Sequence, residues 1–167
     1  MKMTTGRTEA AIVKMNSTSL WITGGRSYGW KYLSSSEFVQ VEGSMPGPEL
    51  PITLTLHTMI NIRHDLTMVI AGETLGNFSI AKTFNYHHNQ GNWFDGPELN
   101  QGRQEHAVGI VTDEVTQEKL VIVTAGCYYH SNSAGYGQWH NLKSTEILIS
   151  DVWSLGEKRA IMARYRF

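Results

Sequence analysis

The tetrapeptide Gly-Pro-Glu-Leu occurs at residues 47–50 and again at residues 96–99, and a histidine follows each copy at the same distance, His57 and His106. After each histidine come an apolar run, a polar turn and a second apolar run that ends in glycine. A period of 49 residues indicates a repeat architecture in which each copy is one supersecondary unit. The sequence therefore predicts a fold built by repetition.

A third, earlier copy becomes visible in the same frame. Ala10 takes the place of the histidine, and Gly25 follows it at the spacing that separates Gly72 from the histidine of the second copy. In the last copy the corresponding glycine, Gly126, lies five residues further from its histidine. We expect this insertion in the polar run 112–119, because a turn can lengthen there without disturbing paired strands.

The apolar runs of each copy are short and are either alternating or β-branched, as at residues 20–23 and 120–124. These are signals of β-strands. No segment keeps a capped apolar stripe of helical period, so we expect almost no helix. A third run follows each glycine, and a weak fourth run lies near Trp93 and Trp153. The pattern predicts an all-β fold with four strands in each repeat of about 50 residues, which is the size of a propeller blade.

At this level the sequence resembles the Kelch repeat, which joins an arginine and histidine strand, a strand ending in Gly-Gly, and a spaced tyrosine and tryptophan. The middle copy is the best match, although Leu54 stands where the other copies have arginine. The matching residues are Arg7, Gly24 and Gly25 in the first copy, His57, Ala71, Gly72, Tyr86 and Trp93 in the second, and Arg103, His106, Gly126 and Trp153 in the third.

The resemblance implies a partial β-propeller of about three four-stranded Kelch-type blades in one domain, residues 1–167, with motifs at about 7–45, 54–94 and 103–154. Propellers close with typically about 4 to 8 blades, because each wedge-shaped sheet needs neighbours on both faces. Three blades therefore imply a fragment of a longer propeller, or copies that pair into a ring. We expect residues 1–167 alone to aggregate or self-associate.

The repeated residues themselves are expected to be structural. The glycines suit a strand end that requires positive φ and close backbone approach. Trp93 and Trp153 suit the widening gap between blades. His57 and His106 are more readily interpreted as packed, hydrogen-bonded histidines than as metal ligands or catalytic bases. Function is therefore expected in the loops between the repeated residues.

In Kelch-like propellers the loops after the glycine strand share one face, which commonly binds a partner peptide or protein. By position, the segments between blades at about residues 46–51 and 97–103 share this face with the loops at residues 26–31, 73–78 and 127–143. Tyrosine, serine, glycine and tryptophan in the last of them resemble an adaptable recognition surface with aromatic anchors. The candidate partner-binding residues are Tyr128, Tyr129, Tyr136, Trp139 and His140, with a smaller set of Arg26, Tyr28 and Trp30.

Three alternatives to this interpretation remain open. The aromatic side chains can instead pack the loop against its own blade. A carbohydrate-binding or sugar-modifying propeller is the other functional alternative, with Trp30 and Trp139 stacking on sugar rings. A truncated or decayed repeat unit without independent activity is a third interpretation.

Composition and motifs disfavour several other classes. Fourteen basic and fifteen acidic residues leave a net charge of -1, which offers no basic field for nucleic acid. No apolar run is long enough to span a membrane, and no secretory signal is recognisable, so we expect a cytoplasmic protein. Adjacent histidines at positions 87 and 88 and the single Cys127 do not make a metal or radical copper site. We expect a non-catalytic module without cofactor or metal.

Overall fold

The computed structural model describes residues 2–114, 116–131, 137–149 and 151–156 of the chain. Within this part the fold is all-β, as the sequence predicts, with one 3-10 turn, η1 (Tyr28–Trp30). No helix of the described part is long and apolar enough to cross a membrane. The strands are β1 (Ala11–Lys14), β2 (Ser19–Thr23), β3 (Arg26–Ser27), β4 (Lys31–Tyr32), β5 (Ser36–Gln40), β6 (Gly43–Gly47), β7 (Thr58–Arg63), β8 (Leu66–Thr74), β9 (Asn77–His87), β10 (Asn92–Asp95), β11 (Ala107–Thr112), β12 (Lys119–Thr124), β13 (Cys127–Ser131), β14 (Gly137–Asn141), β15 (Thr145–Ile149) and β16 (Val152–Leu155).

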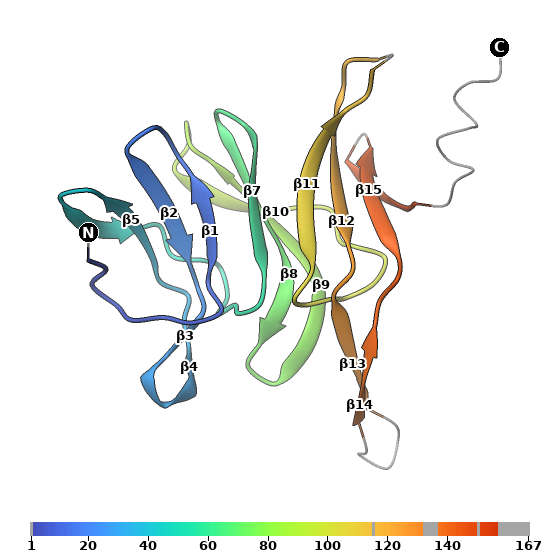
Figure 1. Ribbon diagram of the computed structural model, residues 1–167, viewed down its shortest axis with the longest axis horizontal. Helices are drawn as coiled ribbons and strands as arrows, with labels where there is room; N and C mark the ends of the chain where they lie inside the picture. The colour runs from blue at the N-terminus through green and yellow to red at the C-terminus, as the bar shows by residue number, and fades with distance from the viewer. Residues whose placement is uncertain (1, 115, 132–136, 150, 157–167) are drawn as a thin grey trace.

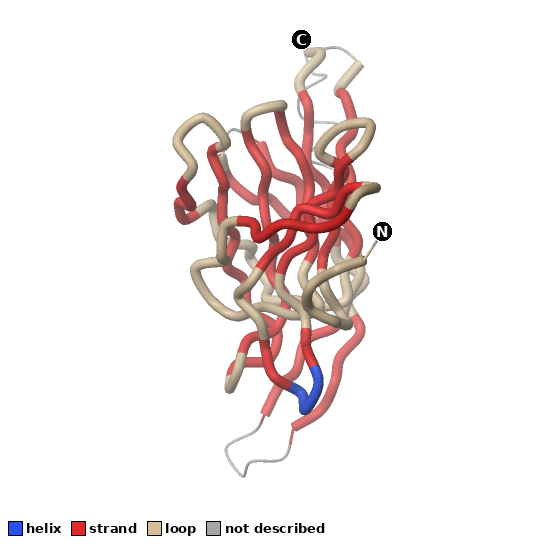
Figure 2. Tube along the Cα trace, turned by 90° about the vertical axis from the view of Figure 1, so that its left-hand side faces the viewer, coloured by secondary structure: helices blue, strands red, loops and turns tan. Residues whose placement is uncertain are grey.

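Each copy of the repeat forms one four-stranded antiparallel sheet. The strand order is β1-β2-β5-β6 in the first sheet, β7-β8-β9-β10 in the second and β11-β12-β15-β16 in the third. A hairpin extends each sheet between its second and third strands: β3–β4, the far ends of β8 and β9, and β13–β14. Figure 1 shows the three hairpins at one end of the molecule, and Figure 2 shows η1 at the same end. We call this the hairpin end.

Two segments differ from the sequence prediction. Residues 127–143, expected as a long loop, contain the hairpin β13–β14, in which Tyr129 pairs with Trp139; aromatic residues favour such pleated, half-buried pairing. Residues 43–47, part of which was expected as a connection between blades, form strand β6. Pro46 is compatible with this strand because β6 lies at the edge of its sheet. Proline has no backbone N–H, and at an edge position the sheet does not need one to hydrogen-bond to a neighbouring strand.

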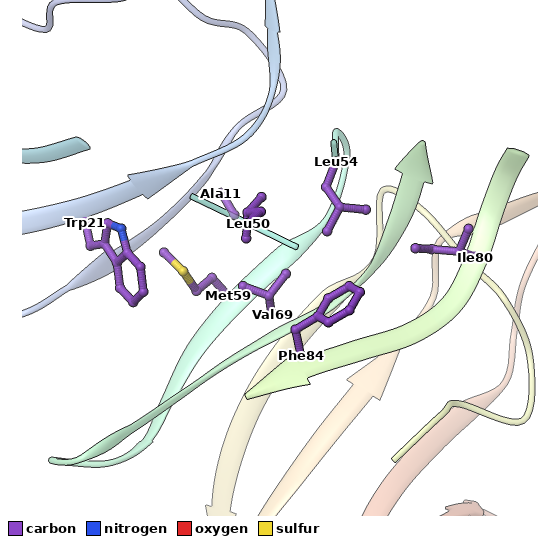
Figure 3. Packing of buried hydrophobic residues seen from close by; sticks show 8 residues of the cluster. All are labelled: Ala11, Trp21, Leu50, Leu54, Met59, Val69, Ile80 and Phe84. Atoms are coloured by element: carbon purple, nitrogen blue, oxygen red, sulfur yellow. The ribbon is translucent and has the colours of Figure 1, made fainter. Parts of the chain in front are cut away.

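The sheets stack face to face and enclose two apolar layers. Figure 3 shows the first layer, between the first and second sheets, which includes Trp21, Val69 and Phe84. The second layer, between the second and third sheets, includes Met68 and Trp153. Successive residues of β8 thus enter opposite layers, and β8 is buried along almost its whole length. A strand covered on both faces has a continuous apolar sequence, whereas β2 buries every second residue.

The first strands of the three sheets lie side by side, because β7 contacts both β1 and β11. Backbone hydrogen bonds join the segments that precede these strands: the Leu56 N–H donates to the Glu9 carbonyl at 3.0 Å, and the Glu105 N–H donates to the Leu56 carbonyl at 3.1 Å. The same bond therefore recurs from sheet to sheet, and the repeat in sequence becomes a repeat in space.

A second recurring bond starts at the glycines. The Gly25 N–H donates to the Leu54 carbonyl at 2.7 Å, and the Gly72 N–H donates to the Arg103 carbonyl at 2.8 Å. Gly72 has φ +101, and a Cβ atom there would lie 2.6 Å from the Thr55 carbonyl oxygen. Both the positive φ and the close backbone contact exclude a side chain, as the sequence predicts for the glycine that ends the second strand.

Buried ion pairs hold the first and third sheets. Arg103 Nη2 lies 2.7 Å from Glu146 Oε1, and neither side chain is exposed. Arg103 Nη1 also donates to the carbonyl of Ala125 at 3.0 Å, while the N–H groups of Asn100 and Gln101 donate to the Glu146 carboxylate. A buried charge is tolerated only when it is paired and hydrogen-bonded in this way.

The first sheet repeats this arrangement. Arg7 Nη2 lies 2.8 Å from Glu37 Oε1, and Arg7 Nη1 donates to the Gly24 carbonyl. Burial raises the pKa of Glu37, but hydrogen bonds from Thr4, Arg7, Ser44 and Thr5 outweigh it and lower the pKa to about 2. The carboxylate is therefore charged at neutral pH.

In the second sheet the equivalent positions are Leu54 and Phe84, both buried in the first apolar layer. The Leu54 carbonyl accepts a hydrogen bond from the N–H of Gly25, as the Arg103 carbonyl accepts one from the N–H of Gly72. Phe84 pairs with Val69 in the sheet register, as Glu146 pairs with Val123. The same site in the fold thus accepts an ion pair or an apolar pair, which explains why the arginine is not present in every copy.

We predict that the Arg103–Glu146 pair is strongly coupled. Arg103→Leu and Glu146→Phe should each destabilise the protein by roughly 3 kcal/mol or more, because each leaves a buried charge without its partner. The double variant Arg103→Leu/Glu146→Phe should lose less unfolding free energy than the two single variants lose together, because it recreates the apolar pair of the second sheet. Urea unfolding of the four proteins measures the coupling, and additive losses would contradict it.

His57 and His106 connect neighbouring sheets. His57 Nε2 lies 2.9 Å from Thr23 Oγ1, and His106 Nε2 lies 2.7 Å from Thr58 Oγ1. Burial lowers the pKa of each histidine to about 3, with a further contribution from the charge of His106 on His57 and of Arg103 on His106. Both imidazoles are therefore neutral packing groups at neutral pH, as the sequence analysis expects.

We predict that stability falls as the pH is lowered from about 7 to 5. Below an unfolded-state pKa of about 6.5 the unfolded chain binds protons that the buried, neutral histidines of the folded protein do not bind. His57→Gln removes one such group, so its unfolding free energy should depend less steeply on pH, by about 1.4 kcal/mol per pH unit near pH 5.5. Urea unfolding at several pH values tests this, and an unchanged slope would refute it.

Candidate functional site

The hairpin end contains a cavity of about 630 Å³ to which all three sheets contribute. We call it the hairpin-end cavity. Its size lies in the range of small-ligand and side-chain pockets. The lining residues are Glu9, Arg26, Tyr32, Leu56, Glu73, Phe78, Gln104, Glu105, Cys127, Trp139 and Asn141.

The repeat places side chains of equivalent position around this cavity. The residue after each left-handed glycine is Arg26, Glu73 or Cys127, and each forms an antiparallel bridge with the segment leading into an inner strand.

In that same segment, the residue two positions before each inner strand is Glu9, Leu56 or Glu105, with φ values of 56, 54 and 55. The backbone thus repeats while the side chains differ, which is the pattern expected where function is separate from packing.

Arg26 is held between two carboxylates. Its Nη2 atom donates to Glu73 Oε1 at 2.7 Å, and its Nε atom forms an ion pair with Glu9 Oε2 at 3.2 Å. Thr55 Oγ1 donates a further hydrogen bond to Glu9 at 2.8 Å. The guanidinium also lies over the ring of Tyr32, 4.7 Å from its centroid. Arg26 is therefore a fixed part of the cavity wall.

Two further groups in the wall remain protonated at neutral pH. Burial raises the pKa of Tyr32, and the hydrogen bond that its hydroxyl donates to Glu73 raises it further. Burial also raises the pKa of Cys127, and the nearby carboxylate of Glu105 adds to this effect. Because the thiolate is the reactive form of cysteine, these surroundings do not activate Cys127 as a nucleophile.

The aromatic residues of β13–β14 pack partly against their neighbours. Tyr129 lies 4.9 Å from Phe78 and 5.0 Å from Trp139, measured between ring centroids. On the other face of the hairpin, Tyr128 and His140 stack at 5.0 Å. Trp139 nevertheless remains 50% exposed and lines the hairpin-end cavity. Packing therefore explains Tyr128 and Tyr129, whereas Trp139 also presents a surface to the cavity.

The other predicted residues divide between two places. Tyr28 is fully exposed and Trp30 is 74% exposed, and both line a second open cavity of about 510 Å³ beside Arg26. The Arg26 guanidinium lies 5.6 Å from the Trp30 ring centroid. Tyr136 lies outside the described residues. The structure thus brings Arg26 and Trp139 together in one cavity and leaves Tyr28 and Trp30 beside it.

The acidic residues of the cavity, Glu9, Glu73 and Glu105, and also Gln104, were not predicted from the sequence. A signal for them was available, because Glu9 and Glu105 directly precede the histidine position of the repeat and Glu73 directly follows its glycine. Residues adjacent to a repeated structural position occupy equivalent places in the fold. Their convergence on one cavity depends, however, on how the sheets stack.

The sequence matches no protein-family model and no curated protein. Among the described residues, no group of three His, Cys, Asp or Glu side chains is arranged to hold a metal ion.

Proposed function

We propose that this chain forms three blades of a Kelch-type β-propeller and binds a protein or peptide through its hairpin end, without catalysing a reaction. The observation that carries the proposal is the hairpin-end cavity, in which equivalent positions of three stacked sheets present different charged and aromatic side chains. Such a surface on a rigid scaffold suits recognition, because a repeated framework holds variable contact residues.

The propeller proposal is supported by the arrangement of the sheets. Each has four antiparallel strands, the first strands lie together, and the same two backbone bonds recur from sheet to sheet. The outer faces of the stack also carry apolar side chains. They include Ile12, Leu20 and Ile22 on the first sheet and Val111, Ile122 and Val152 on the third.

The first sheet shares a hydrogen-bonding feature with the third sheet, which packs against a preceding sheet. The N–H groups of Thr4 and Thr5 donate to Glu37 as those of Asn100 and Gln101 donate to Glu146. In the third sheet these donors belong to the crossover from the preceding sheet. This equivalence supports the proposal that a further sheet, supplied by a second copy of the chain, covers the outer face of the first sheet.

We predict that the purified chain self-associates through its outer faces. Light scattering after size-exclusion chromatography should give a mass above the 18.8 kDa of one chain. Ile12→Lys, at a half-exposed position of β1, should shift the protein toward monomer because it places a charge in the proposed interface. Val41→Lys, at an exposed position in the turn after β5, is the control. A monodisperse monomer with a cooperative melting transition would contradict the proposal.

We predict that the hairpin end selects peptides from a displayed random library. Trp139→Ala should reduce the binding of enriched peptides about tenfold or more, since exposed tryptophans are frequent hot spots. Phe94→Ala, an exposed aromatic residue that does not line the cavity, should leave binding unchanged.

A glycan array with the wild-type protein and the same two variants tests the alternative function, carbohydrate binding. The half-exposed Trp139 beside carboxylates is also compatible with stacking on a sugar ring. Glycan binding that disappears in Trp139→Ala, together with no enriched peptides, would favour the carbohydrate-binding alternative over the protein or peptide partner.

A further inference from the structure

The hairpin-end cavity has an excess of negative charge. Its lining includes three carboxylates, Glu9, Glu73 and Glu105, and a single basic side chain, Arg26. Arg26 is already shared between Glu9 and Glu73. Among the described residues Glu105 forms no salt bridge. One guanidinium cannot neutralise three carboxylates, so the cavity favours a positively charged occupant.

A buried amide supplies an independent indication of a ligand. Gln104 lines the cavity and is only 3% exposed, and its Oε1 atom is buried without a hydrogen-bond partner among the described residues. An unsatisfied buried acceptor is costly, roughly 1–3 kcal/mol, and needs an N–H or O–H donor. Because Oε1 has almost no accessible surface, a donor-rich, cationic ligand satisfies it only when the Gln104 side chain turns toward the cavity.

The cavity also has an aromatic wall. Trp139 and Phe78 are 50% and 45% exposed, and their ring centroids lie 6.1 Å apart in an edge-to-face arrangement. Aromatic faces attract a guanidinium group, and the protein already uses this contact where Arg26 lies over Tyr32. A planar guanidinium can stack on such a wall while its edge donates to a carboxylate.

From these observations we infer that the hairpin-end cavity binds an arginine side chain of the partner. Glu105 accepts the charged hydrogen bonds, Trp139 covers the guanidinium, and Gln104 Oε1 accepts a further hydrogen bond once its side chain turns toward the cavity. Arginine fits better than lysine because its planar fork can donate to two acceptors while it stacks. This inference rests on the proposed function of the hairpin end, and it names the chemistry of the partner.

The direct test uses a small probe. Nα-acetyl-arginine methylamide is titrated into the ¹⁵N-labelled protein, and the indole N–H resonance of Trp139 is followed by NMR. The citrulline analogue, which has nearly the same shape but no charge, should bind about tenfold more weakly. Glu105→Gln should abolish the preference for arginine, whereas Glu98→Gln, an exposed glutamate outside the cavity lining, should preserve it.

The outcomes separate the two proposals. Equal binding of arginine and citrulline, no shift of Trp139 with either, or an arginine preference that survives Glu105→Gln would overturn the arginine inference. In each of these cases, a library that still yields peptides dependent on Trp139 leaves partner binding intact. A library that yields no such peptides contradicts the proposed function, even where the arginine probe binds.

Discussion

The close approach between a left-handed glycine and the segment leading into the next inner strand is the constraint on which the structure depends. At Gly72 the N–H donates to the carbonyl of Arg103, and the absent side chain lets the Thr55 carbonyl approach. This contact joins one sheet to the next, and it recurs between both pairs of neighbouring sheets. It also directs the chain beyond the glycine into the hairpin end, so that packing and the candidate site follow from the same backbone geometry.

The stack accommodates very different side chains at equivalent positions. An ion pair occupies the site in the third sheet, where Arg103 and Glu146 are fully buried, and an apolar pair occupies it in the second, where Leu54 and Phe84 join the first apolar layer. Both arrangements avoid an unpaired polar group in the interior. The ion pair does so by hydrogen bonding, and the apolar pair contains no polar side-chain atom. Comparing the copies in sequence shows that these residues differ, but it does not show that the two positions form a pair. The partners of each pair lie about 30 to 43 residues apart along the chain.

Only part of the candidate site could be predicted from the sequence. Trp139 was predicted as a contact residue from the composition of its segment, and it lies half-exposed at the cavity. The prediction also included Tyr128 and Tyr129, whose rings pack against His140, Phe78 and Trp139. Composition alone does not separate these roles, since an aromatic ring satisfies a packing contact and a binding contact equally well. The acidic half of the cavity was not predicted, because its glutamates belong to three different sheets.

By itself the sequence determined the all-β class, a repeat of three four-stranded units and the place of the glycines, but it did not place the fourth strand of the first sheet, β6, or the hairpins β3–β4 and β13–β14. These properties are local: apolar alternation and β-branching act over a few residues, and positive φ acts at one. Only the tertiary structure decided that Glu9, Glu73 and Glu105 surround one cavity with Arg26 and Trp139. Their convergence depends on face-to-face stacking of the sheets, which brings together residues that no short-range pattern connects.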